Sequence, residues 1–213
     1  MTKSNDKQIK AIVFDYGGVI ELYKGRNTII KISELLNVPV DDLRAVYFQN
    51  NHISNVENML WEDMIVKVVS VFTDDQSLKD QARAIAVDAQ ISRELNNDLL
   101  SLFPLFKQQG LKIGILSNSD SSLRKRLEDN GVAKLVDAIA ISGEIGFQKP
   151  NPKAFQNIFE KLQVEPNKVI FVDDAKKSLE TAEQIGYVPI LFRGNDQLKI
   201  DLREIGVLSD SSI

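Results

Sequence analysis

The 213-residue sequence contains no cysteine and only one histidine. Without cysteine, a thiol nucleophile, a disulfide framework and a cysteine-ligated zinc are all excluded. No apolar run approaches the roughly 20 residues that a membrane-spanning helix needs. The polar start MTKSNDKQIK also lacks the apolar middle of a secretory signal. We therefore expect a soluble protein of the cytoplasm with no membrane partner.

The sequence also has no excess of positively charged residues. The chain has 26 basic and 30 acidic residues, for a net charge of -4, which leaves no electrostatic footprint for nucleic acid. No glycine loop ending in Gly-Lys-Ser or Gly-Lys-Thr is present, so binding of nucleoside triphosphates is not indicated. We expect a small-molecule partner, while the sequence leaves the oligomeric state open.

The chain does contain a buried-strand pattern that ends on an acid. The apolar run from Ala11 to Phe14 is followed by Asp15 and by a turn with Gly17 and Gly18. Such a run is typical of a parallel strand covered on both faces. It brings the Asp15 carboxylate into a tight turn at the end of that strand.

Further strands and helices alternate in the second half of the chain. After a helix expected at 95–109, strands are expected at 112–116, 136–141, 169–172 and 188–192, and helices at 121–130, 153–162 and 176–185. This alternation with short connections predicts an α/β fold, a doubly wound, Rossmann-like parallel sheet with helices on both faces.

Between the first strand and these repeats lies a block with helical spacing and no clear strand from 27 to 96. We expect about four helices there, at 28–36, 41–48, 59–71 and 78–87, with Asp41 capping the second and Ser54 or Asn55 the third. The predicted division is a Rossmann-like core of residues 1–21 and 97–213 and an inserted small helical cap of residues 22–96.

Polar residues follow three of the predicted strands at their carboxyl ends, where ligands bind in such sheets: Asp15, Ser117 and Asp173. Asp15 has two readings, as an Asx residue bonded to its own turn or as a nucleophile or metal ligand. Asp173 and Asp174 repel each other unless a cation compensates, and their oxygens suit Mg²⁺, although either could simply cap the next helix.

Two weaker signals belong to the same end of the sheet. Residues 117–120, Ser-Asn-Ser-Asp, could cap the following helix or, with free amides and a hydroxyl, hold an anion. Lys149 precedes Pro150 and Pro152, which stiffen its segment, although most lysines are solvated surface residues. Together these residues favour a single polar site.

The order of these motifs resembles the haloacid dehalogenase-like hydrolase superfamily, in its helical-cap (C1) branch with an Asp-x-Gly-Gly first motif. The matching motifs are FDYGGV (14–19), ILSNSD (115–120), GFQKPNPKAF (146–155) and IFVDDAKKSLETAEQIGY (170–187). The resemblance implies a cap that closes over the site and sets specificity. It also implies the following roles: Asp15 as aspartyl nucleophile, Ser117 and Asn118 holding the phosphoryl group, Lys149 neutralising charge, and Asp15, the Gly17 carbonyl, Asp173 and Asp174 around Mg²⁺.

One departure from the family pattern concerns Gly17. Phosphatases of this superfamily usually carry there a second aspartate that protonates the leaving group, and such acid–base help is worth about 10² to 10⁴ in rate. We therefore weigh a Mg-dependent phosphatase of a small phosphorylated metabolite, a sugar phosphate being one candidate, against two alternatives. These are a 2-haloacid dehalogenase and a low-turnover phosphate-binding or regulatory protein. The substrate and the source of the leaving-group proton stay open.

Three other residues have less chemistry to offer. We expect His52 to be a loop residue between cap helices and Trp61 to pack within a cap helix. Tyr16, directly after Asp15, is expected to line the substrate pocket.

Overall fold

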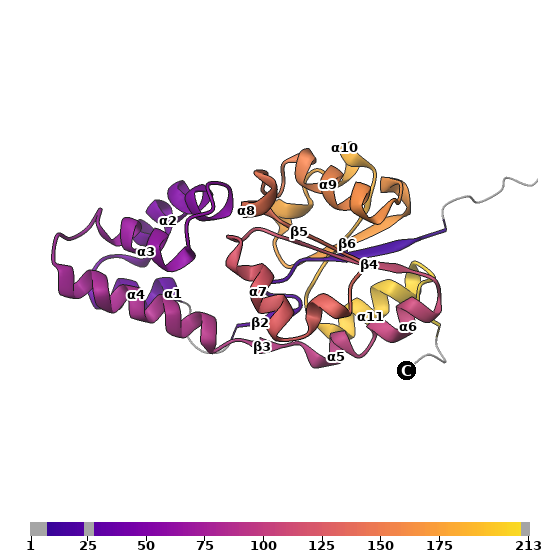
Figure 1. Cartoon of the computed structure of the whole chain (residues 1–213), viewed down its shortest axis with the longest axis horizontal. Helices are drawn as coiled ribbons and strands as arrows, with labels where there is room; N and C mark the ends of the chain where they lie inside the picture. The colour runs from indigo at the N-terminus through magenta and orange to yellow at the C-terminus, as the bar shows by residue number, and fades with distance from the viewer. Residues whose placement is uncertain (1–7, 24–27, 210–213) are drawn as a thin grey trace, which may run out of the picture.

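The computed structural model describes residues 8–23 and 28–209. Within these ranges the main sheet has five parallel strands in the order β5-β4-β1-β6-β7 (Figure 1). They are β1 (Ala11–Phe14), β4 (Lys112–Ser117), β5 (Ala138–Ile141), β6 (Val169–Asp173) and β7 (Val188–Leu191). The expected doubly wound, Rossmann-like α/β fold is confirmed.

Alternate residues of β1 belong to two different hydrophobic cores, because successive side chains of a strand point to opposite faces of the sheet. Ile12 and Phe14 pack with α5 (Asn97–Leu100), α6 (Phe103–Gln108), α7 (Ser122–Asp129) and α11 (Asn195–Glu204). Ala11 and Val13 pack with α9 (Pro152–Leu162) and α10 (Ala182–Ile185). All four strand residues are fully buried, which explains the unbroken apolar run.

The inserted block forms a helical body beside the sheet, which we call the helical cap (Figure 1). Its helices are α1 (Thr28–Leu36), α2 (Val40–Asn55), α3 (Trp61–Val69) and α4 (Gln76–Ile91). They enclose a separate cluster of buried side chains that includes Ile32, Leu43, Met64 and Val68. The division at residues 22 and 96 remains a prediction. None of the helices in the described part of the chain has the length and apolar character to cross a bilayer.

Several local predictions were wrong. Glu94–Leu95 forms β3, which pairs antiparallel with β2 (Glu21–Leu22), although no strand was expected between 27 and 96. Two residues are too few to show a period of two. The helix expected at 95–109 is two helices, because Pro104 occupies the first turn of α6, where its missing N–H costs nothing.

Other differences concern helix ends. The helix expected at 176–185 is a 3₁₀ turn (Lys176–Leu179) followed by the short α10. Asp41 lies in the first turn of α2, which Pro39 precedes, and Ser54 and Asn55 end that helix instead of capping α3. Short elements that the periodicity did not indicate are α8 (Ser142–Ile145) and two 3₁₀ turns (Val132–Lys134 and Pro166–Lys168).

The direction of the sheet connections changes between β1 and β6. The chain proceeds from β1 to β4 and β5 on one side and then returns to β6 and β7 on the other. Phe14 is in register with Val172, and the Asp15 N–H donates to the Val172 carbonyl at 2.8 Å. Asp15 and Asp173 are therefore neighbours at the carboxyl edge, at the switch point where such sheets bind ligands.

Candidate active site

Three carboxylates meet at this edge of the sheet. Oxygen atoms of Asp15, Asp173 and Asp174 all lie within 4.8 Å of one another. Asp15 follows β1, Asp173 ends β6, and Asp174 is the next residue, so adjacent parallel strands bring them together. The sequence placed these acids at strand ends, and the structure brings all three into one cluster.

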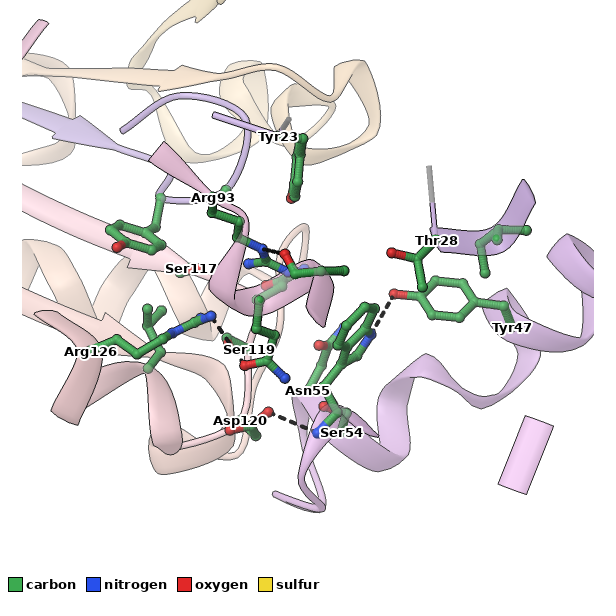
Figure 2. A pocket seen from close by; sticks show the side chains of 18 of the residues that line it. Tyr23, Thr28, Tyr47, Ser54, Asn55, Arg93, Ser117, Ser119, Asp120 and Arg126 are labelled. Atoms are coloured by element: carbon green, nitrogen blue, oxygen red, sulfur yellow. Dashed lines mark hydrogen bonds between the residues drawn. The ribbon is translucent and has the colours of Figure 1, made fainter. Parts of the chain in front are cut away.

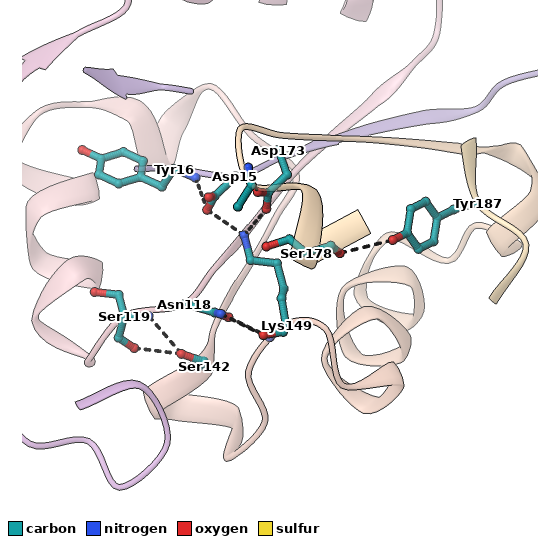
Figure 3. A network of polar contacts seen from close by, with 10 residues as sticks. Asp15, Tyr16, Asn118, Ser119, Ser142, Lys149, Asp173, Ser178 and Tyr187 are labelled. Carbon is teal, nitrogen blue, oxygen red and sulfur yellow. Dashed lines mark hydrogen bonds and ion pairs between the residues drawn. The ribbon is translucent and has the colours of Figure 1, made fainter. Parts of the chain in front are cut away.

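Lys149 joins two of these acids (Figure 3). Its Nζ lies 2.9 Å from Asp15 Oδ1 and 2.6 Å from Asp173 Oδ2, and its side chain is only 1% exposed. The ammonium also lies 5.3 Å from the centre of the Phe171 ring. A buried ammonium between two carboxylates is a fixed positive charge in this site.

Burial and neighbouring charges shift the titration of the cluster. Burial raises the pKa of Asp15 to about 7, with Lys149 opposing the rise and Asp173 adding to it. Burial also raises the pKa of Asp174, and repulsion from Asp173 acts in the same direction. For Lys149, burial lowers the pKa, but attraction to Asp15 and Asp173 outweighs it, so the net shift is upward. Burial and mutual repulsion therefore both favour the protonated form of Asp15 and Asp174 in this site.

The donor set fits a magnesium ion. Three carboxylates offer hard oxygen ligands in one place, and Mg²⁺ is commonly held by one or two carboxylates together with water and phosphate oxygens. Asp174 has no ion-pair partner among the described residues, whereas the other two acids share Lys149. A cation at this point would relieve the repulsion that raises the pKa of Asp15 and Asp174.

Asn118 holds the backbone of Lys149 in place. Its Oδ1 accepts from the Lys149 N–H at 2.7 Å and its Nδ2 donates to the Lys149 carbonyl at 3.0 Å (Figure 3). Both polar atoms of this side chain therefore face the main chain of residue 149. The predicted contact of Asn118 with a phosphoryl group remains a prediction, and no sequence pattern indicated its partner 31 positions away.

Asp15 and Ser117 complete the floor of the site. Asp15 Oδ1 accepts from the N–H of Tyr16 at 2.7 Å, which is the turn-bonding interpretation, and it contacts Lys149 as well. The two readings of Asp15 are thus compatible. Ser117 ends β4, is buried, and lines the cavity described below. Asp173 likewise accepts from the Ala175 N–H at 2.8 Å while it binds Lys149.

Two glycines make room around the carboxylates. A β-carbon at Gly18 would overlap the carboxylate of Asp174, and the φ angle of +82° at Gly18 is one that residues with a side chain rarely adopt. At Gly17, a β-carbon would lie 2.6 Å from the hydroxyl oxygen of Tyr23. The turn after β1 therefore tolerates side chains at neither position without movement of a neighbour.

A cavity of about 530 Å³ extends from the carboxyl edge of the sheet to the helical cap (Figure 2). The core contributes Gly17, Ser117 and Asn118 to its lining. The aromatic and arginine side chains in the cap-side lining are Tyr23, Arg44, Tyr47, Phe48, Trp61 and Arg93. Such a cavity has the size of a small-molecule site.

Tyr16, Trp61 and His52 can now be placed. Tyr16 borders the cavity as expected, but it is buried, and its hydroxyl donates to Glu21 at 3.0 Å and accepts from Asn130 at 2.9 Å. Trp61 packs with the cap helices and borders the cavity. His52 belongs to α2 and not to a loop; its Nε2 lies 3.5 Å from a carboxylate oxygen of Glu57, and it plays no part in the site.

Sequence reasoning missed Tyr23 and Arg93 as cavity residues. The guanidinium of Arg93 lies 5.2 Å from the centre of the Tyr23 ring and 5.7 Å from that of Trp61. It also pairs with Glu21 at 2.8 Å. Burial raises the pKa of Tyr23 to about 12, Arg93 opposes the rise, and the carboxylates of Asp15 and Asp174 add to it. No motif spacing marks either residue.

Comparison with known proteins gives one family for most of the chain. Residues 9–186 match the model of the haloacid dehalogenase-like hydrolases. Phosphatase MT3486 of Mycobacterium tuberculosis (strain CDC 1551 / Oshkosh) is 24% identical over 213 residues, which cover 96% of this chain and 98% of the relative. The bifunctional epoxide hydrolase 2 of Rattus norvegicus is 24% identical over 92% of this chain, which spans only 39% of that protein.

Solved structures show the same fold. A predicted HAD-like family hydrolase from Porphyromonas gingivalis superposes with a TM-score of 0.67 at 18% identity, covering 93% of this chain and 98% of that one. The HAD family enzyme bt-2542 from Bacteroides thetaiotaomicron, in complex with magnesium and inorganic phosphate, gives a TM-score of 0.60 at 17% identity. That match covers 85% of this chain and 93% of the other.

Proposed function

Because the chain belongs to the haloacid dehalogenase-like hydrolases, we propose that it is a magnesium-dependent phosphatase of a small phosphorylated metabolite, with a sugar phosphate as one candidate. The observation that carries this proposal is the cluster of Asp15, Asp173 and Asp174, in which the first two acids share the buried ammonium of Lys149. This arrangement combines a nucleophile, oxygen ligands for a hard cation and a positive charge for a phosphoryl group. A phosphatase among its relatives supports the same reaction class.

In the proposed reaction Asp15 is the nucleophile. One of its carboxylate oxygens attacks phosphorus in line with the leaving oxygen, forming an aspartyl phosphate that water then hydrolyses. Lys149, 2.9 Å from Asp15, offsets charge on the phosphoryl oxygens, and Asp173 orients that ammonium at 2.6 Å. Ser117 and the main-chain amides of the turn after β1 donate to the same oxygens.

Magnesium would be held by Asp15, Asp173, Asp174 and the Gly17 carbonyl, and it would supply the positive charge that phosphoryl transfer needs at the transferred group. The chain's own residues keep the nucleophile and the ammonium aligned. The cavity between core and cap, about 530 Å³, would take the rest of the substrate.

A panel of phosphate monoesters, assayed with Mg²⁺ and with EDTA, tests this function. We expect hydrolysis that requires Mg²⁺ and that falls by at least about 10³-fold in Asp15→Asn, because an amide cannot form the acyl phosphate. Full magnesium-dependent activity in Asp15→Asn would disprove the mechanism. Release of halide from 2-haloacids in EDTA would replace the proposal with the dehalogenase alternative.

Gly17 favours a second candidate function, a phosphate-binding or regulatory protein with low turnover. A glycine provides no proton for the leaving alcohol, and this would slow the cleavage of alkyl esters most. Binding of inorganic phosphate without turnover of any ester in the panel would support this candidate.

A further inference from the structure

The side of the site next to Gly17 lacks the acid that the family usually places there, but it does not lack a hydroxyl. A β-carbon built on Gly17 would lie 2.6 Å from the hydroxyl oxygen of Tyr23 and 3.6 Å from the ring carbon that carries it. The phenol oxygen therefore occupies the space into which a side chain at position 17 would project. Gly17 and Tyr23 border the same cavity as Ser117 and Asn118.

Two neighbouring features position the Tyr23 side chain. Tyr23 directly follows β2, whose pairing with β3 sets the direction of the chain at that point. The guanidinium carbon of Arg93 lies 5.2 Å from the centre of the Tyr23 ring, and both side chains line the cavity in Figure 2. Arg93 is itself tied down by Glu21 at 2.8 Å and by the carbonyl of Ala89 at 3.2 Å.

The rest of Tyr23 lies at the mouth of the cavity, because 63% of the residue is exposed. A hydroxyl beside Gly17, on a residue that is otherwise largely exposed, suits a group that meets the part of a substrate leaving toward the cap. A phenol carries its proton at neutral pH, so it can donate where a glycine cannot.

We infer that Tyr23 replaces the missing aspartate as the proton donor to the leaving oxygen. This inference rests on the proposed phosphatase function. As the Asp15 oxygen bonds to phosphorus and the bond to the leaving oxygen breaks, the hydroxyl proton of Tyr23 passes to that oxygen and the alcohol departs. When water attacks the aspartyl phosphate, its proton returns to the Tyr23 oxygen, phosphate is released and the Asp15 carboxylate is restored.

The experiment compares two esters that differ in their need for a proton. 4-Nitrophenyl phosphate has a leaving group that departs as a stable anion, whereas an alkyl phosphate such as glycerol phosphate does not. In Tyr23→Phe we expect kcat/KM for the alkyl ester to fall by about 10² to 10³, within the usual range of acid–base help, and for the aryl ester by only a few fold. Tyr47→Phe, which removes another cavity hydroxyl, should leave the ratio of the two rates unchanged.

A second pair of variants tests the shared space. The alkyl-ester activity of Gly17→Asp alone should not exceed that of the wild type, because the new β-carbon would lie 2.6 Å from the Tyr23 hydroxyl oxygen. In Gly17→Asp/Tyr23→Phe the space is vacated, and we expect at least about tenfold recovery of alkyl-ester hydrolysis over Tyr23→Phe. Melting temperatures identify variants that fail to fold.

The outcomes distinguish a failure of the Tyr23 inference from a failure of the proposed phosphatase function. Equal losses on both esters in Tyr23→Phe, or no loss on the alkyl ester, would overturn the role of Tyr23 and leave the phosphatase intact. A wild-type chain that cleaves neither ester with Mg²⁺ would remove both proposals.

Discussion

Asn118 and Lys149 are joined by two hydrogen bonds between the Asn118 carboxamide and the main-chain N–H and carbonyl of Lys149, at 2.7 and 3.0 Å. The contact links the loop after β4 to the segment before α9. It therefore sets where the Lys149 ammonium emerges between Asp15 and Asp173. The position of the buried Lys149 ammonium therefore depends on Asn118, whether or not Asn118 contacts a substrate.

Asn118→Ala should impair both stability and catalysis. The buried main-chain groups of Lys149 lose their partners, which costs about 1 to 3 kcal/mol, and the ammonium loses its alignment. We expect a lower melting temperature together with a fall in kcat. Asn151→Ala is the matched control, because it removes an asparagine cap at the start of α9, where Oδ1 accepts from the Lys153 N–H at 3.0 Å. It should cost about 0.5 to 2 kcal/mol and leave kcat unchanged. Equal effects of the two variants on kcat would contradict the alignment role.

Asp174→Asn should weaken the binding of Mg²⁺. A ligand present at 100 times its Kd stabilises the folded state by about 2.7 kcal/mol, so Mg²⁺ should raise the melting temperature of the wild type. The variant should show a much smaller rise, because it loses one of the three clustered carboxylates. Asp129→Asn removes an acid that pairs with Lys125 on the surface of α7, and it should keep the full rise. An unchanged response in Asp174→Asn would exclude this acid as a ligand.

Gly18→Ala combines a backbone cost with a collision. The φ angle of +82° makes any side chain unfavourable by about 1 to 2 kcal/mol, and the new methyl group would also displace the carboxylate of Asp174. Gly110→Ala is the control, since its φ angle of +77° imposes a similar cost with no atom within 4 Å. Both variants should melt at lower temperature, but only Gly18→Ala should reduce the response to Mg²⁺. If Gly110→Ala reduced it equally, the effect would be one of general stability.

Asp120 connects the cap to the core. Its Oδ2 accepts from the N–H of Trp61 in the cap at 3.1 Å, and its Oδ1 accepts from Ser122 at the start of α7 at 2.9 Å. Asp120→Ala should loosen the cap and raise KM several-fold, because the cavity lies between these two parts. Asp75→Ala, which removes the N-terminal capping side chain of helix α4, should lower the free energy of unfolding by about 0.5 to 2 kcal/mol without changing KM. Steady-state kinetics and thermal unfolding distinguish the two results.

The sequence predicted the sheet and the acids of the site for a simple reason. Apolar runs ending in polar residues mark strand ends, and parallel strands collect those ends at one edge. Asp15, Ser117 and Asp173 could thus be grouped from their strand ends, whereas Lys149, which ends no strand, was assigned to the site on the weaker signal of the prolines beside it. Contacts that depend on how loops pack could not be read in this way. The Asn118 partner, the Tyr23 hydroxyl and the link from Asp120 to Trp61 each join segments that no periodicity relates.

The two crossings between the sheet and the helical body lie side by side. Glu21 pairs with Leu95, Leu22 pairs with Glu94, and the Asn96 N–H donates to the Ile20 carbonyl at 2.8 Å. The chain therefore leaves and re-enters the sheet domain at one paired connection. Replacement of the helical body between these two segments, by evolution or by engineering, could change the substrate specificity while the residues at the edge of the sheet stay the same.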